Sequence, residues 1–164
     1  MMLFEEIVVG EVTDLGSHIF TAEDIKRFAS AFDPQPFHMD EAAAEASHFG
    51  KLCASGWHTL AVWMRLNVRK LQELQREQAR SGAKAARLGP SPGFEDLKWL
   101  KPVFAGDKVT YQTEIIAKRE SRSRPGWGLV SMRSIGRNQA GEDVVSFIGH
   151  VFVERGEAAA PGNE

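Results

Sequence analysis

Apolar and polar side chains recur with two different periods along the chain. Residues 21–32 carry apolar side chains at the i, i+3, i+4 and i+7 spacing, which gives a helix one apolar face. Thr21 can cap the start of this segment. Asp33 precedes Pro34 and should end it, because the residue before a proline avoids the α conformation. The pattern therefore predicts a helix that stops at Asp33.

Two more helices are expected before the middle of the chain. Asp40 can cap a short one that begins at residue 41. A longer helix is predicted to begin near Gly56 and to continue through residue 75, with a charged second half that faces water. Its first half is apolar almost all round, which predicts that it is buried. Residues 81–93 are rich in turn-forming residues and indicate a connecting loop.

Strand-like runs replace the helical pattern after Phe94. Four β-branched and aromatic runs follow one another with turn-forming residues between them, which favours an antiparallel meander. The last run is apolar on both faces and should be a central, covered strand. Two shorter β-rich runs lie near the start of the chain. The six runs are 7–12, 17–20, 94–100, 108–118, 128–137 and 143–154.

A single-layer sheet must cover its apolar face, and the long helix that begins at Gly56 is the natural cover. We therefore predict an α+β fold in which an antiparallel β-sheet wraps around a long central α-helix. No repeat or linker divides the chain, so we expect one domain over residues 1–154. The small and polar residues 155–164 are expected to form a disordered tail.

Composition narrows the class of protein without giving a function. The chain has 164 residues, of which 43% are hydrophobic and 26% charged, and its net charge is −2. The sequence contains no block of like charges, which argues against a nucleic-acid-binding protein. The single cysteine, Cys53, excludes an internal disulfide and fits a reducing compartment. We see no secretory leader and no apolar run near the roughly 20 residues that cross a membrane. A cytoplasmic protein with no membrane partner is therefore expected.

The first candidate site is the stretch AFDPQPFHMD, residues 31–40, which places an acid, Asp33, five positions before an imidazole, His38. The simpler interpretation is a helix end followed by a turn, since Asp-Pro is common in turns. The functional interpretation is an acid–base pair. Pro34 and Pro36 would hold the pair at a fixed separation, because prolines lower the entropy cost of ordering the loop. An apolar pocket would raise the pKa of such a carboxyl toward neutrality.

The second candidate site is the start of the long helix. In the simpler interpretation Ser55 is a helix cap and Gly56 allows close packing. In the functional interpretation, free N–H groups and the positive end of the helix dipole face a developing oxyanion, and Gly56 lets a substrate carbonyl approach the backbone. Trp57 would then contact the substrate. His58 is expected to pack or to form a hydrogen bond rather than to catalyse.

The segment ESRSRPGWG, residues 120–128, contains Arg122 and Arg124, and Arg119 directly precedes it. Its default interpretation is a solvated hairpin tip, and the alternative is contact with a phosphate-bearing ligand. The metal-site motifs HExxH and CxxC are absent from the sequence, as are the glycine-rich nucleotide-binding motifs. We therefore expect no metal and no resident cofactor.

Three motifs in order resemble those of the MaoC-like dehydratases, relatives of the (R)-specific enoyl-CoA hydratases. The resemblance covers roughly Phe4 to Glu154. DPQPFH, residues 33–38, with Ala44 after five further residues, resembles the hydratase signature. HFGKLCASGWHTLA, residues 48–61, resembles the run into the family's central helix. LKWLKPVFAGDKVTYQTEI, residues 97–115, resembles a strand, a P-V-x-x-G-D turn and a long strand.

This resemblance implies a hot-dog fold whose subunits pair sheet edge to sheet edge, as a homodimer or a dimer of dimers. It implies reversible addition of water across a 2-enoyl thioester of coenzyme A or an acyl-carrier protein, with Asp33 and His38 as the catalytic pair. The Gly56 N–H would bind the thioester oxygen. Arg122 and Arg124 become candidate contacts for coenzyme A phosphates.

The chain departs from the family pattern at several positions. Gln35 replaces an asparagine, Phe32 replaces the glycine before the aspartate, and Met64 lies where the family often has a serine. These changes leave the size of the acyl chain open, although Trp57 and Trp63 indicate a filled, short pocket.

Two other functions remain open at the level of sequence. One is a hot-dog acyl-CoA thioesterase, which uses a carboxylate to activate water against the carbonyl carbon. The other is a non-catalytic subunit that binds acyl thioesters. A thioesterase does not need an imidazole on the loop that carries its acid, so His38 favours hydration.

Overall fold

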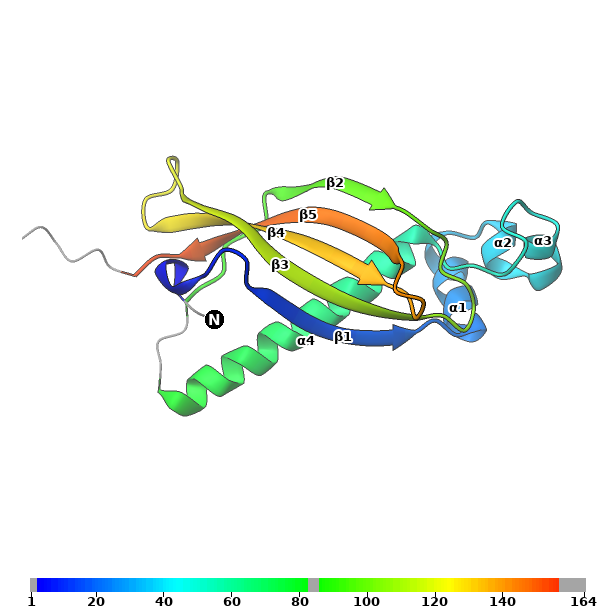
Figure 1. Cartoon of the computed structure of the whole chain (residues 1–164), viewed down its shortest axis with the longest axis horizontal. Coiled ribbons are helices and arrows are strands. Elements are labelled where there is room, and N and C mark those ends of the chain that lie inside the picture. Colours follow the sequence, from blue (N-terminus) through cyan, green and yellow to red (C-terminus); the bar gives the residue numbers. More distant parts are fainter. Residues whose placement is uncertain (1–2, 83–85, 157–164) are drawn as a thin grey trace, which may run out of the picture.

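The computed structural model describes residues 3–82 and 86–156. Its main element is a five-stranded antiparallel sheet with the strand order β1-β3-β4-β5-β2. A long helix, α4 (Gly56–Ser81), crosses one face of this sheet (Figure 1). The strands are β1 (Val12–Ile19), β2 (Gly93–Trp99), β3 (Lys108–Glu120), β4 (Trp127–Arg137) and β5 (Asp143–Glu154). This arrangement confirms the predicted α+β fold.

Three shorter helices gather at one end of the sheet, beyond the first turn of α4, and a 3-10 turn lies at the opposite end (Figure 1). They are α1 (Ala22–Phe32), α2 (Pro36–Met39) and α3 (Glu41–Glu45), and the 3-10 turn is η1 (Phe4–Glu6). The short helices therefore surround the start of α4, where the sequence places its candidate chemistry.

Local sequence accounts for the ends of these helices. Thr21 Oγ1 accepts a hydrogen bond from the Asp24 N–H at 3.1 Å, and Asp40 Oδ1 accepts one from the Ala43 N–H at 2.8 Å. Both predicted caps are thus confirmed. The sequence did not indicate α2. Pro36 begins this helix, where its missing N–H removes no helical hydrogen bond and its fixed φ suits the first turn.

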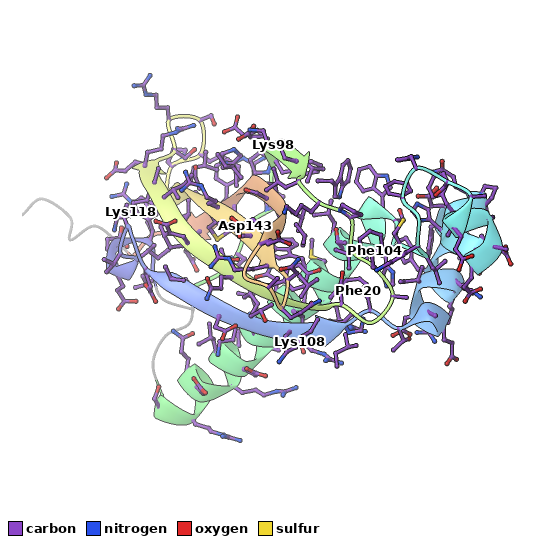
Figure 2. The ribbon with its side chains drawn as sticks, turned by 45° about the vertical axis from the view of Figure 1, so that its right-hand side comes forward. Phe20, Lys98, Phe104, Lys108, Lys118 and Asp143 are labelled. Atoms are coloured by element: carbon purple, nitrogen blue, oxygen red, sulfur yellow. The ribbon has the colours of Figure 1, made fainter. Side chains whose placement is uncertain are left out.

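The first half of α4 packs on the sheet and covers the main hydrophobic core. Val62 and Leu66 belong to one buried cluster with Tyr111 and Val145. The buried Tyr111 hydroxyl donates a hydrogen bond to the Thr59 carbonyl at 3.0 Å, which satisfies a polar group that would otherwise be costly to bury. Side chains at the end of the sheet nearest the short helices include Phe20 and Phe104 (Figure 2).

The prediction that the first half of α4 is buried nearly all round is wrong for the single chain. Trp57 and Met64 are 54% and 51% exposed. The helix rests on one face of one sheet, so the sheet covers only the stripe that contains His58, Val62 and Leu66. An apolar outer surface therefore remains on this half of the helix.

β3, β4 and β5 form the predicted meander, but the prediction is wrong for β2, which pairs with β5 and not with the next strand, β3. The two short runs expected near the start are replaced by one strand, β1, which carries a bulge between Asp14 and Gly16. The bulge is accommodated by Gly16, whose φ of 95° suits glycine. β5 lies between β4 and β2, as its two apolar faces predicted.

The start of the predicted tail is tied to the body of the protein. Arg155 lies 3.2 Å from Glu5 and 2.8 Å from Glu120, and the Gly156 N–H donates to the Glu5 carboxylate at 3.0 Å. The rest of that tail, 157–164, lies outside the described residues. Within residues 3–82 and 86–156, no helix is long and apolar enough to cross a membrane.

Candidate active site

Helix α1 carries Asp33 at its C-terminal end. The Asp33 N–H still donates to the Ala29 carbonyl at 2.9 Å, but the φ and ψ of Asp33, −154° and 69°, turn the chain out of the helix. Pro34 follows and prevents a further helical turn. Asp33 Oδ1 accepts a hydrogen bond from Gln35 Nε2 at 2.8 Å. The carboxylate is therefore held by its own loop.

His38 lies on α2 with only 5% of its surface exposed. Its Nδ1 is 2.7 Å from the Cys53 carbonyl oxygen. Because a carbonyl oxygen can only accept, Nδ1 carries the proton in this contact. The other ring nitrogen, Nε2, faces Asp33, and 3.5 Å separates it from Asp33 Oδ2. The structure thus brings the two side chains of the first candidate site together.

Ser55 connects this pair to the start of α4. Its side chain, in a residue only 1% exposed, accepts a hydrogen bond from the Trp57 N–H at 3.2 Å and also hydrogen-bonds the Asp33 carboxylate. The Gly56 N–H donates to no acceptor within residues 3–82 and 86–156. An available donor at the first turn of α4 is therefore next in sequence to the residue that contacts Asp33.

The ionisation of Asp33 differs from the sequence-based expectation. Partial burial raises the pKa of its carboxyl, but hydrogen bonds from Ser55 and Gln35 and the nearby His38 imidazole outweigh that effect. The pKa of Asp33 is consequently lowered below its ordinary value, whereas an apolar pocket was expected to raise it. The Gln35 contact is local in sequence, but the Ser55 contact could not be anticipated, because Ser55 reaches Asp33 only through the fold. These contacts favour the ionised, carboxylate form of Asp33.

Two tryptophans lie on the other side of the helix start. Trp57, in α4, and Trp99, the last residue of β2, form an edge-to-face pair with ring centroids 5.2 Å apart. The Trp99 indole lies so close to Gly56 that a Cβ on that residue would be 2.5 Å from Trp99 Nε1. Only glycine allows this approach. Sequence reasoning missed Trp99, because its contact with Gly56 joins two elements that are far apart in the chain.

Arg122 and Arg124 lie away from this site. They belong to the turn between β3 and β4, at the end of the sheet opposite the short helices (Figure 1). β3 has 13 residues, which at about 3.3 Å per residue span about 40 Å. One chain therefore does not bring these arginines to its own Asp33.

The remaining candidate residues, Cys53 and His58, are packed into the structure. Cys53 is buried, and burial raises the pKa of its thiol to about 11; its backbone carbonyl and its Sγ lie 2.7 Å and 3.7 Å from His38 Nδ1. His58 packs as expected: its ring stacks on Phe28 with centroids 4.5 Å apart. In the part of the chain that the structure describes, no group of three or more His, Cys, Asp or Glu side chains could hold a metal ion.

The five-stranded antiparallel sheet with one long helix across its face is a hot-dog fold, the fold of a solved MaoC-like dehydratase. The family model described as "MaoC like domain" matches residues 8–135. The chain therefore belongs to the MaoC-like family.

Individual relatives agree with that assignment. A crystal structure of a MaoC-like dehydratase from Rhodospirillum rubrum is 37% identical, covers 96% of this chain and 100% of that one, and superposes with a TM-score of 0.78. The uncharacterized protein YdeM of Bacillus subtilis is 28% identical over 125 residues, 76% of this chain and 81% of its own. Mesaconyl-CoA hydratase of Cereibacter sphaeroides is 39% identical over 69 residues, 42% of this chain but only 20% of that protein.

Proposed function

We propose that the protein is a hydro-lyase that adds water to, and removes it from, a 2-enoyl thioester. The observation that carries the proposal is the 3.5 Å approach of His38 Nε2 to Asp33 Oδ2 beside the unused Gly56 N–H. Membership of the MaoC-like family and the partial likeness to mesaconyl-CoA hydratase support it.

Two acceptors face the reacting water in this proposal. The lowered pKa of Asp33 favours its carboxylate form, and His38 Nε2 can accept when the single ring proton is on Nδ1, against Cys53. An incoming water can donate one O–H to each. As its oxygen bonds to Cβ of the enoyl group, the pair takes one proton, and the same pair then returns a proton to Cα. Dehydration is the reverse sequence.

The thioester oxygen gains negative charge while the Cα–Cβ double bond is being attacked. The Gly56 N–H, at the positive end of the α4 dipole, can donate to that oxygen. Asp33, through Ser55, is fixed next to this donor, so the water and the thioester can be held at once.

The substrate in this proposal is an acyl thioester of coenzyme A or an acyl-carrier protein, and the active form is a homodimer or a dimer of dimers. β2 is an edge strand, and Phe94 and the residue after the strand, Leu100, expose apolar surface there. A two-fold axis at this edge would pair β2 with its copy in antiparallel fashion and place the partner's β3–β4 turn near this protomer's short helices. The partner's Arg122 and Arg124 would then serve the coenzyme A phosphates.

Hydration is tested with purified protein and 2-enoyl-CoA substrates of increasing chain length, by following the loss of the conjugated thioester absorbance. We expect Asp33→Asn and His38→Gln each to lower kcat by about 10² to 10⁴, the range for a lost general acid–base group. Asp96→Asn and His48→Gln change an exposed carboxylate and an exposed imidazole and should leave kcat unchanged.

A parallel assay for free thiol separates the alternatives. Release of coenzyme A from saturated acyl-CoA would identify a thioesterase. Binding of acyl-CoA with no hydration at any chain length would identify a non-catalytic subunit. Wild-type turnover by Asp33→Asn would show that the carboxylate is not the catalytic group.

A further inference from the structure

We infer that the indole N–H of Trp99 is a second hydrogen-bond donor to the thioester oxygen, beside the Gly56 N–H. This inference rests on the proposed function, because it concerns the same thioester. It gives a catalytic role to Trp99, the last residue of β2. Asp33 and His38 approach the start of α4 from the short helices instead.

The two donors are close enough to share one oxygen atom. Trp99 Nε1 is 2.5 Å from the position that a Gly56 Cβ would occupy. That Cβ and the Gly56 nitrogen are bonded to the same Cα and lie about 2.5 Å apart, so Nε1 is within about 5 Å of the nitrogen. Two N–H donors that each bond an oxygen at about 2.9 Å can be up to about 5.8 Å apart. One thioester oxygen can therefore accept from both.

The indole is available to a ligand. Within residues 3–82 and 86–156, neither Trp99 Nε1 nor the Gly56 nitrogen donates to a protein acceptor. Trp99 is 45% exposed, so one side of the ring remains open. A donor with no protein partner next to an unused backbone donor is the arrangement that an oxyanion requires.

The ring is also held in place before any substrate arrives. Trp99 ends β2 and pairs in register with Val145 of β5, and the next residue, Leu100, donates its N–H to the Val144 carbonyl at 2.8 Å. The Trp57 ring meets the indole edge to face at 76°. Donors that are already oriented stabilise a developing charge without a cost of reorganisation.

The competing explanation is that Trp99 only packs on Gly56. Phenylalanine keeps an aromatic ring there and lacks the N–H, so we expect Trp99→Phe to lower kcat by about tenfold to a hundredfold, because one oxyanion donor is typically worth about 10² to 10³ and Gly56 remains. Trp127→Phe is the matched control. It removes an indole N–H at the start of β4, at the opposite end of the sheet, and kcat should change little.

A second measurement tests the Trp99 hydrogen bond in a complex that does not turn over. A bound saturated acyl-CoA should show a lowered carbonyl stretching frequency in wild type, and Trp99→Phe should move that frequency back toward the value of the free thioester. A thioether analogue of the same length has no carbonyl oxygen, so its affinity should be equal in both proteins. If Trp99→Phe does not fold, benzothienylalanine at position 99 keeps the bicyclic shape and lacks the N–H.

The outcomes separate this inference from the proposed function. If Asp33→Asn abolishes hydration while Trp99→Phe keeps both kcat and the carbonyl frequency of wild type, the hydro-lyase stands and the second donor is wrong. If no enoyl thioester is hydrated but the frequency shift depends on Trp99, the donor stands and the reaction is wrong. Failure of both the thioester and the thioether to bind would overturn both.

Discussion

The two halves of α4 rest on the sheet in different ways. Up to Leu66, the helix buries His58, Thr59, Val62 and Leu66, whereas none of residues 67–81 is buried. Beyond Leu66, a groove of about 790 Å³ lies between the helix and the sheet, with Leu71 and Leu74 on the helix side. Both halves continue one regular helix, yet only the first is fixed by packing.

The difference explains where chemistry can be placed. The groups proposed to act on the thioester all lie at the packed end: Ser55 caps the helix and contacts Asp33, while the Trp99 indole covers Gly56. Side chains that are fixed by packing and hydrogen bonds keep the precise geometry that proton transfer needs. The distal half has no such neighbours and depends on its own helix-forming residues and its end cap.

The same truncation in each half should give the largest contrast. Leu66→Ala removes a buried side chain from the core and should lower the free energy of unfolding by about 2 to 5 kcal/mol, through lost burial and the cavity left behind. Leu71→Ala is the matched change over the groove and should cost less than about 1 kcal/mol. Denaturant unfolding measures both. Equal losses would mean that the two halves are packed alike.

Sequence patterns predicted most of the fold, because its elements have strong periodic signals and local caps. The caps at Thr21 and Asp40 and the end of α1 at Asp33 needed only neighbouring residues. Burial of α4 was overestimated, since a helix that is apolar all round does not reveal which side a single sheet covers. Trp57 and Met64 show the error.

The candidate site was predictable where it is local in sequence. Asp33 and His38 are five positions apart, and one loop brings them together. Gln35, which also lowers the pKa of Asp33, lies in that loop, but the contacts from Ser55 and the Cys53 carbonyl come from another segment. No pattern within residues 31–40 encodes those partners. The same holds for Trp99, whose position over Gly56 depends on the pairing of β2 with β5.

Acid should weaken the packed half of α4 through His58. Burial, followed by the charge of His18, lowers the pKa of His58 from 6.5 to about 4, and His58 Nδ1 has no hydrogen-bond partner among the described residues. The unfolded chain therefore binds a proton near pH 6.5 that the folded protein does not bind until about pH 4. Stability is full above pH 6.5 and falls as the pH drops toward 4, by at most about 3 kcal/mol from this residue.

Urea unfolding between pH 7.5 and pH 4.5 in wild type and His58→Phe tests that expectation. Phenylalanine keeps an aromatic ring against Phe28 and cannot be protonated, so the variant should lose less stability in acid. His18, Asp24, Arg65 and Arg27 also act on the His58 charge, and His18→Gln is the control for the nearest imidazole. Identical pH slopes in wild type and His58→Phe would remove His58 as the cause.

The smallest effect is expected at the far end of the helix. Gly82 terminates α4 with φ 70° and ψ 6°, a left-handed conformation, and no atom of residues 3–82 and 86–156, apart from its chain neighbours and the α4 backbone, lies within 4 Å of where its Cβ would be. Gly82→Ala should therefore cost only the backbone penalty of about 1 kcal/mol. Gly82→Asn should cost less, since asparagine adopts this conformation more readily.

The informative result at Gly82 is the combination of stability with activity. Because residues 67–81 are not buried against the sheet, strain at Gly82 can be relieved by fraying of the distal half. Circular dichroism should then report lower helix content in Gly82→Ala, while kcat for hydration remains that of wild type. If kcat fell together with helix content, the order of residues 67–81 would affect the position of Gly56. In that case packing at Leu66 does not isolate the site from the rest of α4.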